Sequence, residues 1–91
     1  MSETTAGKIE RLLRTRLNPS HFELVDDSAK HAGHPGASSG GGHYSVVVVS
    51  EAFEGLSRLD RHRLVYEALG NMVGTEIHAL ALRTATASEW G

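Results

Sequence analysis

The chain has 91 residues and a formal net charge of −2, with six histidines and no cysteine. This length supports one domain with one core, spanning residues 1–91. The weak negative charge gives no global electrostatic reason to expect tight binding to nucleic acid or to an anionic membrane. Because cysteine is missing, disulfides and thiolate chemistry from this chain are excluded, and any sulfur ligand has to come from a partner.

The sequence shows no membrane or export signal. No apolar run approaches the roughly 20 residues that a membrane-spanning helix needs. Residues 1–8 lack the basic and apolar regions of a signal peptide. We therefore expect a cytoplasmic protein that makes no membrane contact.

The first half of the chain predicts a helix, a strand and a long loop. Apolar residues recur at spacings of three and four over residues 5–17, which predicts an amphipathic helix that ends before Pro19. Residues 21–25 alternate in polarity and predict a half-exposed strand. A loop follows from residue 26, and its five glycines make the part at about 28–42 flexible.

The second half predicts a buried strand and a helix. The β-branched run 44–49 is typical of a central strand that is buried on both faces. Residues 53–56 indicate a short turn. Ser57 is then placed as the N-cap of a helix, and Gly74 is placed to end it.

A third strand, residues 77–82, completes the predicted sheet. Residues 86–89 have the form of a capping box for a terminal turn that ends at Trp90. The predicted fold is α+β, in the order αββααβ with a three-stranded mixed sheet. The tightly linked first two strands are antiparallel, whereas the strand–helix–strand crossover makes the second and third parallel.

This topology gathers histidines at one end of the sheet. The two parallel strands begin at the same end, where His43 precedes one and His78 opens the other. The loop that carries His31 and His34 has to pass that end. Imidazoles bind borderline metal ions, so we predict a shared metal site built from these four histidines. The alternative for each is a solvated or hydrogen-bonded structural histidine, and the sequence spacing alone does not indicate zinc.

A cationic segment is the second candidate site. It lies at the start of the predicted second helix and consists of Arg58, Arg61, His62 and Arg63. It is interpreted either as a solvated face that nearby carboxylates partly neutralise, or as a docking patch for a partner's acidic groups or for phosphate.

The chain resembles the BolA family from its first helix to Trp90. The motifs that carry the resemblance occur in the family's order and spacing: Ser28–His31, His43–Ser50 (HYSVVVVS), Phe53–Leu56 (FEGL), Arg61–Tyr66 (RHRLVY), Ile77–Leu82 (IHALAL) and Thr86–Trp90.

The resemblance implies a fold related to the type II KH topology and partnership with monothiol glutaredoxins. In such heterodimers a [2Fe-2S] cluster is shared, with sulfur ligands from the glutaredoxin cysteine and from glutathione. Carried over by position, His78 is one ligand and His31 occupies the variable loop position. The loop departs from the shorter bacterial pattern through His34 and the 40–42 glycines, so the second ligand stays open among His31, His34 and His43. The isolated chain is expected to be a monomer.

Nucleic-acid binding is the alternative function, because some BolA-like proteins are linked to transcriptional regulation. A KH domain grips nucleic acid with a GXXG loop between its helices. Here that junction, residues 54–57, reads EGLS, and the literal match at residues 33–36 lies between strands. DNA would therefore contact residues 58–63.

An enzyme is not expected, since no nucleophile with a paired base and no phosphate loop is present. The predicted function is a non-enzymatic partner in iron–sulfur cluster trafficking or in iron and redox regulation.

Overall fold

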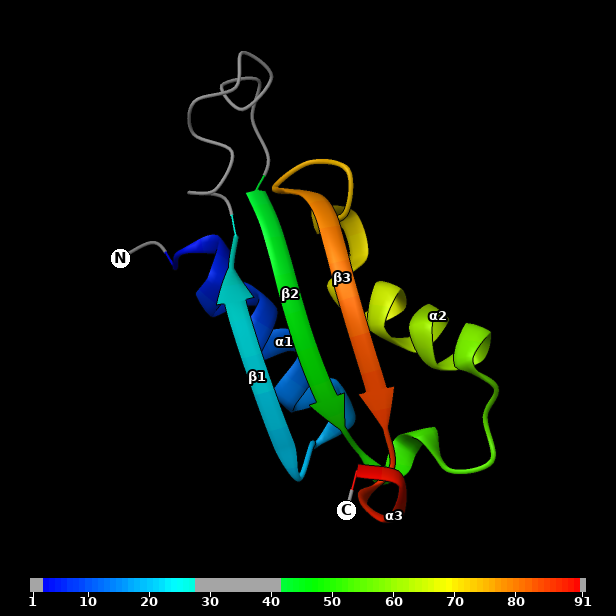
Figure 1. The fold of residues 1–91 in the computed structure, drawn as a ribbon. Coiled ribbons are helices and arrows are strands. Elements are labelled where there is room, and N and C mark those ends of the chain that lie inside the picture. Colours follow the sequence, from blue (N-terminus) through cyan, green and yellow to red (C-terminus); the bar gives the residue numbers. More distant parts are fainter. Residues whose placement is uncertain (1–2, 28–41, 91) are drawn as a thin grey trace.

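The computed structural model describes residues 3–27 and 42–90 (Figure 1). Within these ranges one contiguous hydrophobic core is formed. The predicted flexible loop at about 28–42 lies almost entirely outside the described residues. The elements in chain order are α1 (Thr5–Leu17), β1 (His21–Asp26), β2 (Gly42–Val49), the 3₁₀ turn η3 (Glu51–Phe53), α2 (Arg58–Leu69), the 3₁₀ turn η4 (Gly70–Met72), β3 (Ile77–Ala85) and α3 (Ala87–Trp90).

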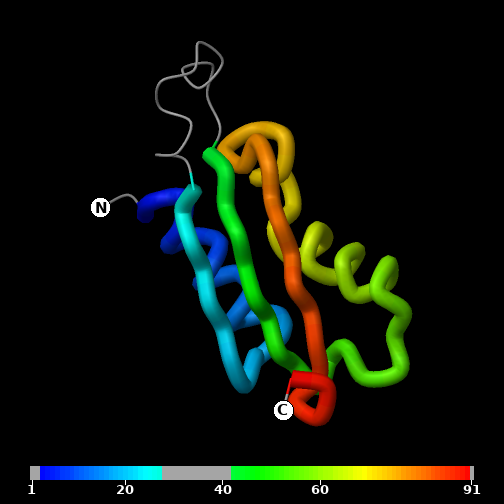
Figure 2. The backbone as a smooth tube through the Cα atoms, viewed as in Figure 1, coloured from blue at the N-terminus to red at the C-terminus, as the bar shows by residue number. Residues whose placement is uncertain are grey.

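The sheet has the predicted topology. Its strand order is β1-β2-β3, with β1 antiparallel and β3 parallel to the central strand β2. Figure 2 follows the backbone through the crossover and shows the starts of β2 and β3 side by side. The α+β class and the three-stranded mixed sheet are therefore confirmed. The strands extend slightly beyond their predicted ends.

Helices α1 and α2 both pack on one face of the sheet. Tyr44, Val46 and Val48 point into this core, whereas Ser45 and Val47 alternate with them and are only partly buried. The prediction that β2 is buried on both faces is thus wrong. A β-branched run favours an extended strand, but it does not say on how many sides helices will cover that strand.

Helix α1 forms where its apolar spacing and its end signals agree. Ile9, Leu13 and Leu17 recur every four residues and are buried against the sheet. The hydroxyl of Thr4 accepts a hydrogen bond of 3.0 Å from the backbone N–H of Gly7 and caps the first turn. At the other end Asn18 adopts a left-handed conformation with φ 45°, directly before the proline that stops the helix.

The segment between β2 and β3 contains the single predicted helix, although the order αββααβ counts two. It holds one α-helix, α2, flanked by the 3₁₀ turns η3 and η4. The Ser57 hydroxyl caps α2 as predicted, since it accepts a hydrogen bond from the backbone N–H of Asp60. The helix ends at Leu69 because Gly70, with φ 59°, departs from helical geometry four residues before Gly74.

After β3 the Glu89 half of the predicted capping box is present. The backbone N–H of Thr86 donates to Oε1 of Glu89 at 2.9 Å and begins α3. Among the described residues, no helix combines the length and the hydropathy that crossing a membrane requires.

Candidate functional site

The two parallel strands start at the same end of the sheet, and the structure places His43 and His78 together there. Their ring centroids are 5.2 Å apart and their planes are inclined by 50°. The end of β1 lies at this edge too, because the backbone N–H of Asp27 donates to the carbonyl of His43 at 2.7 Å. Of the four predicted metal ligands, these two are brought together, and His31 and His34 lie outside the described residues.

A β-bulge presents His78. Gly42 is paired with Ile77, whereas the next residue, His43, is paired with Ala79, so His78 is the extra residue on β3. Bulges re-aim side chains at the rims of sheets and often lie beside functional sites. Ile77 is fully buried and anchors the strand, while His78 is exposed. The imidazole of His78 is therefore available to a ligand at the surface.

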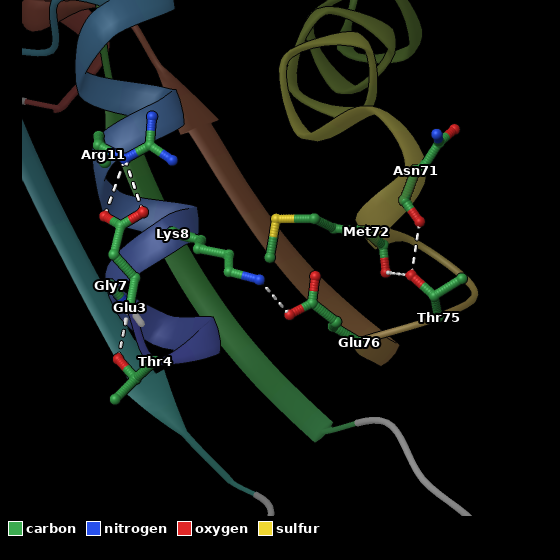
Figure 3. A network of polar contacts seen from close by, with 9 residues as sticks. All are labelled: Glu3, Thr4, Gly7, Lys8, Arg11, Asn71, Met72, Thr75 and Glu76. Carbon is green, nitrogen blue, oxygen red and sulfur yellow. Dashed lines mark hydrogen bonds and ion pairs between the residues drawn. The ribbon is translucent and has the colours of Figure 1, made fainter. Parts of the chain in front are cut away.

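The turn that leads into β3 is closed by hydrogen bonds, as Figure 3 shows in part. The Thr75 hydroxyl donates to the carbonyls of Asn71 at 2.6 Å and Met72 at 3.1 Å. The backbone N–H of Gly74 donates to the carbonyl of Ile77 at 2.8 Å. Next in the chain, the carboxylate of Glu76 accepts a hydrogen bond of 2.7 Å from Nζ of Lys8 in α1.

Two polar residues beside the histidines were missed by the sequence analysis. The Ser45 hydroxyl donates to Oδ2 of Asp27 at 2.6 Å. Both residues, with His43, Ala79 and Ala81, line a shallow hollow of about 260 Å³ on the sheet face that the helices leave open. No sequence motif marks this pair, because only the antiparallel register of β1 and β2 brings Asp27 beside Ser45.

The spacing of the two rings equals that of two imidazoles on one metal ion, and it also lies within the ordinary range of an aromatic contact. Two imidazoles bound to one tetrahedral metal ion through bonds of about 2.0–2.1 Å hold their ring centroids roughly 5 Å apart. The observed 5.2 Å matches this spacing. Within residues 3–27 and 42–90, no group of three or more His, Cys, Asp or Glu side chains is placed to hold a metal ion. Any metal held by this pair would need further ligands from outside these residues.

The predicted cationic segment does not form one free patch. Arg61 is bound by Glu89 through two hydrogen bonds of 2.5 and 3.0 Å, its Nε donates to the carbonyl of Leu56, and its side chain is only 13% exposed. Arg63 lies 3.6 Å from the carboxylate of Asp60. Arg58 and His62 line a hollow of about 530 Å³ together with Arg61, Leu82, Arg83 and Glu89.

Two of the charged side chains in this hollow, Arg61 and Glu89, are paired with each other. Hydrogen bonding from Arg61, followed by that from the backbone of Thr86, lowers the pKa of Glu89 from 4.5 to about 2. The same carboxylate raises the pKa of Arg61. Arg83, which the sequence analysis did not single out, lies with Cζ 5.0 Å from the ring centroid of Trp90. The hollow therefore keeps a surplus of positive charge on a chain of net negative charge.

The architecture and the site together define a small α+β protein with a mixed three-stranded sheet, helices on one face and a histidine pair where the parallel strands begin. A family model described as BolA-like protein matches residues 13–89. The chain belongs to the BolA family.

Characterised relatives agree with this assignment. The chain is 43% identical over 88 residues to BolA-like protein 1 of Homo sapiens, covering 92% of this chain and 62% of the human protein. It is 42% identical over 83 residues to the DNA-binding transcriptional regulator BolA of Escherichia coli (strain K12), covering 91% and 76%. The solved structure of BolA1 from Arabidopsis thaliana superposes with a TM-score of 0.83 at 36% identity, covering 98% of both chains. The chain thus spans about three fifths of the human relative's length.

Proposed function

We propose that this chain is a non-catalytic partner of a monothiol glutaredoxin, and that His43 and His78 supply imidazole ligands to a [2Fe-2S] cluster shared by the two proteins. The observation that carries the proposal is the pairing of these rings at 5.2 Å, with His78 exposed. Imidazole is a ligand suited to iron. The pair occupies the edge where the parallel strands begin, so a partner can approach it from solvent.

The ligand count supports the need for a partner. Iron–sulfur clusters are held mainly by cysteine thiolates, and this chain has no cysteine. In one known class of [2Fe-2S] centre two histidines replace two cysteines on one iron, which raises the reduction potential. The same division would leave the second iron to thiolates from the glutaredoxin and from glutathione. Because imidazole has to be deprotonated to bind, such a cluster would be pH-sensitive.

The choice of the second ligand is part of the proposal. The family resemblance points to His31, which lies outside the described residues, and the ring of His43 lies beside His78. We propose His43. Cluster trafficking or iron and redox regulation in the cytoplasm is the role that this chemistry suits, with the chain monomeric until the glutaredoxin binds.

The test is to mix the purified protein with a cluster-loaded monothiol glutaredoxin and glutathione, and to follow visible circular dichroism and complex size. Wild type should form a heterodimer with an altered spectrum. His43→Asn and His78→Asn should each lose or change that spectrum. His21→Asn, at the opposite end of the sheet, is the matched histidine control and should behave as wild type. If the spectrum is lost in His78→Asn and in either His31→Asn or His34→Asn, but not in His43→Asn, then the loop histidine is the second ligand in place of His43.

DNA binding is a second candidate, favoured by the surplus positive charge of the hollow that Arg58, His62 and Arg83 line. The relative from Escherichia coli is named a DNA-binding transcriptional regulator. Phosphate contacts by arginine would make binding weaken steeply with salt. If no glutaredoxin complex forms, while duplex DNA is bound in a salt-dependent way that Arg58→Gln weakens, this second candidate replaces the first.

A further inference from the structure

We infer that Lys8 and Glu76 are positioning residues for the histidine pair: their ion pair ties helix α1 to the turn before β3 and so sets His78 and His43 relative to each other. This inference rests on the proposed function, because it explains how the two rings are held ready for a shared ligand. Neither residue is itself proposed to touch that ligand.

The contact joins distant parts of the chain. Nζ of Lys8 lies 2.7 Å from Oε1 of Glu76, 68 positions later in the sequence. Both side chains are partly covered, with 35% and 38% of their surface exposed. Partial burial reduces screening by water and strengthens such a pair relative to a fully exposed one. Figure 3 shows Lys8 reaching from α1 across to Glu76.

The helix end of the contact is rigid. Lys8 directly precedes Ile9, which is fully buried in the core. The backbone N–H of Lys8 donates to the carbonyl of Thr4 at 3.0 Å, within the capped first turn of α1. Lys8 therefore holds Glu76 against a fixed support.

The other end of the contact acts on both histidines. The carbonyl of Glu76 accepts a hydrogen bond of 2.8 Å from the backbone N–H of Gly42, the residue before His43. Glu76 is also followed by Ile77 and then His78 in the bulge. One residue thus links the strand start that carries His43 to the strand start that carries His78.

The turn itself is poorly able to absorb a displacement of Glu76. The Thr75 hydroxyl is bonded to the carbonyls of Asn71 and Met72, and Gly74 is bonded across the turn to Ile77. A shift at Glu76 is therefore transmitted to the starts of both β2 and β3. Ligand groups that are fixed in advance lose less conformational freedom on binding, which is the advantage of this arrangement.

The test compares Lys8→Met and Glu76→Gln with Glu10→Gln. Glu10 forms an ion pair of the same length, 2.7 Å, with Arg14 on the outer side of the same helix. In the metal-free protein, nuclear magnetic resonance of the imidazoles should show the contact between the rings of His43 and His78 weakening in both test variants and unchanged in Glu10→Gln. In the glutaredoxin complex, affinity should fall about tenfold in both, at the lower end of what supporting residues contribute to a metal site.

The two test variants also separate positioning from a simple field effect. Removing a cation and removing an anion change the electrostatic field at His78 in opposite directions, whereas loss of positioning weakens the ring contact in both. The charge-swapped double variant Lys8→Glu with Glu76→Lys should restore the contact between the rings and the affinity.

Opposite shifts in the two single variants, or changes no larger than those of Glu10→Gln, would overturn the inference. Failure of wild type to bind the glutaredoxin would instead overturn the proposed function, and the ring contact in the metal-free protein would still test the positioning role.

Discussion

At the start of β3, two neighbouring residues have different roles, one in folding and one in binding. Ile77 is fully buried and takes part in the core, whereas His78 is exposed in the bulge. The buried side chain anchors the strand, and the bulge turns the next side chain toward His43. Binding and folding are thus assigned to adjacent positions, which makes the two roles separable by mutation.

We predict that Ile77→Ala lowers the free energy of unfolding by about 2–5 kcal/mol, because it leaves a cavity in the core. His78→Ala should change it by no more than about 0.5 kcal/mol, as is usual for an exposed position. Urea unfolding followed by the fluorescence of Trp90 measures both. Equal losses in the two variants would contradict this division of roles.

At the scale of elements, α3 is held to the rest of the fold by a small set of contacts. Glu89 accepts hydrogen bonds from Arg61 and from the backbone of Thr86. Trp90 stacks on His21 with ring centroids 5.1 Å apart, and Arg83 lies over it as well. His21, at the start of β1, thus serves as part of this attachment.

The lowered pKa of Glu89 predicts how this attachment responds to acid. The pKa is about 2 in the folded protein and 4.5 as the ordinary value, so the carboxylate stabilises the fold above pH 4.5. That contribution is lost as pH falls from 4.5 to about 2. Thermal unfolding against pH should therefore show a gap between wild type and Glu89→Gln that is largest above pH 4.5 and closes near pH 2. A gap independent of pH would show that the effect does not arise from this titration.

For the whole molecule, the topology could be predicted from periodicity and connection length. The helical spacing of residues 5–17 and the crossover between residues 50 and 76 are enough to place three strands in a mixed sheet with His43 and His78 at one end. Strand order and direction follow from the hydrophobic pattern of each segment and from the handedness of the crossover, and both can be read from nearby residues.

The features that could not be predicted depend on how the helices pack and on the exact register of the strands. That helices cover only one face of β2 follows from where α1 and α2 pack, which the run 44–49 does not encode. The extra residue at His78 and the contact between Asp27 and Ser45 need the exact strand register. The Arg61 contact with Glu89 joins positions 28 residues apart, so residues 58–63 could not be recognised as partly engaged from their spacing alone.

The proposed function requires that His43 and His78 bind the same iron of a shared cluster. The most direct measurement is pulsed electron paramagnetic resonance of the reduced [2Fe-2S] cluster in the glutaredoxin complex, with the histidines of this chain labelled with ¹⁵N. Two coupled imidazole nitrogens are predicted in wild type, and one in each of His43→Asn and His78→Asn. Two coupled nitrogens that persist in His43→Asn, or none in wild type, would contradict the claim.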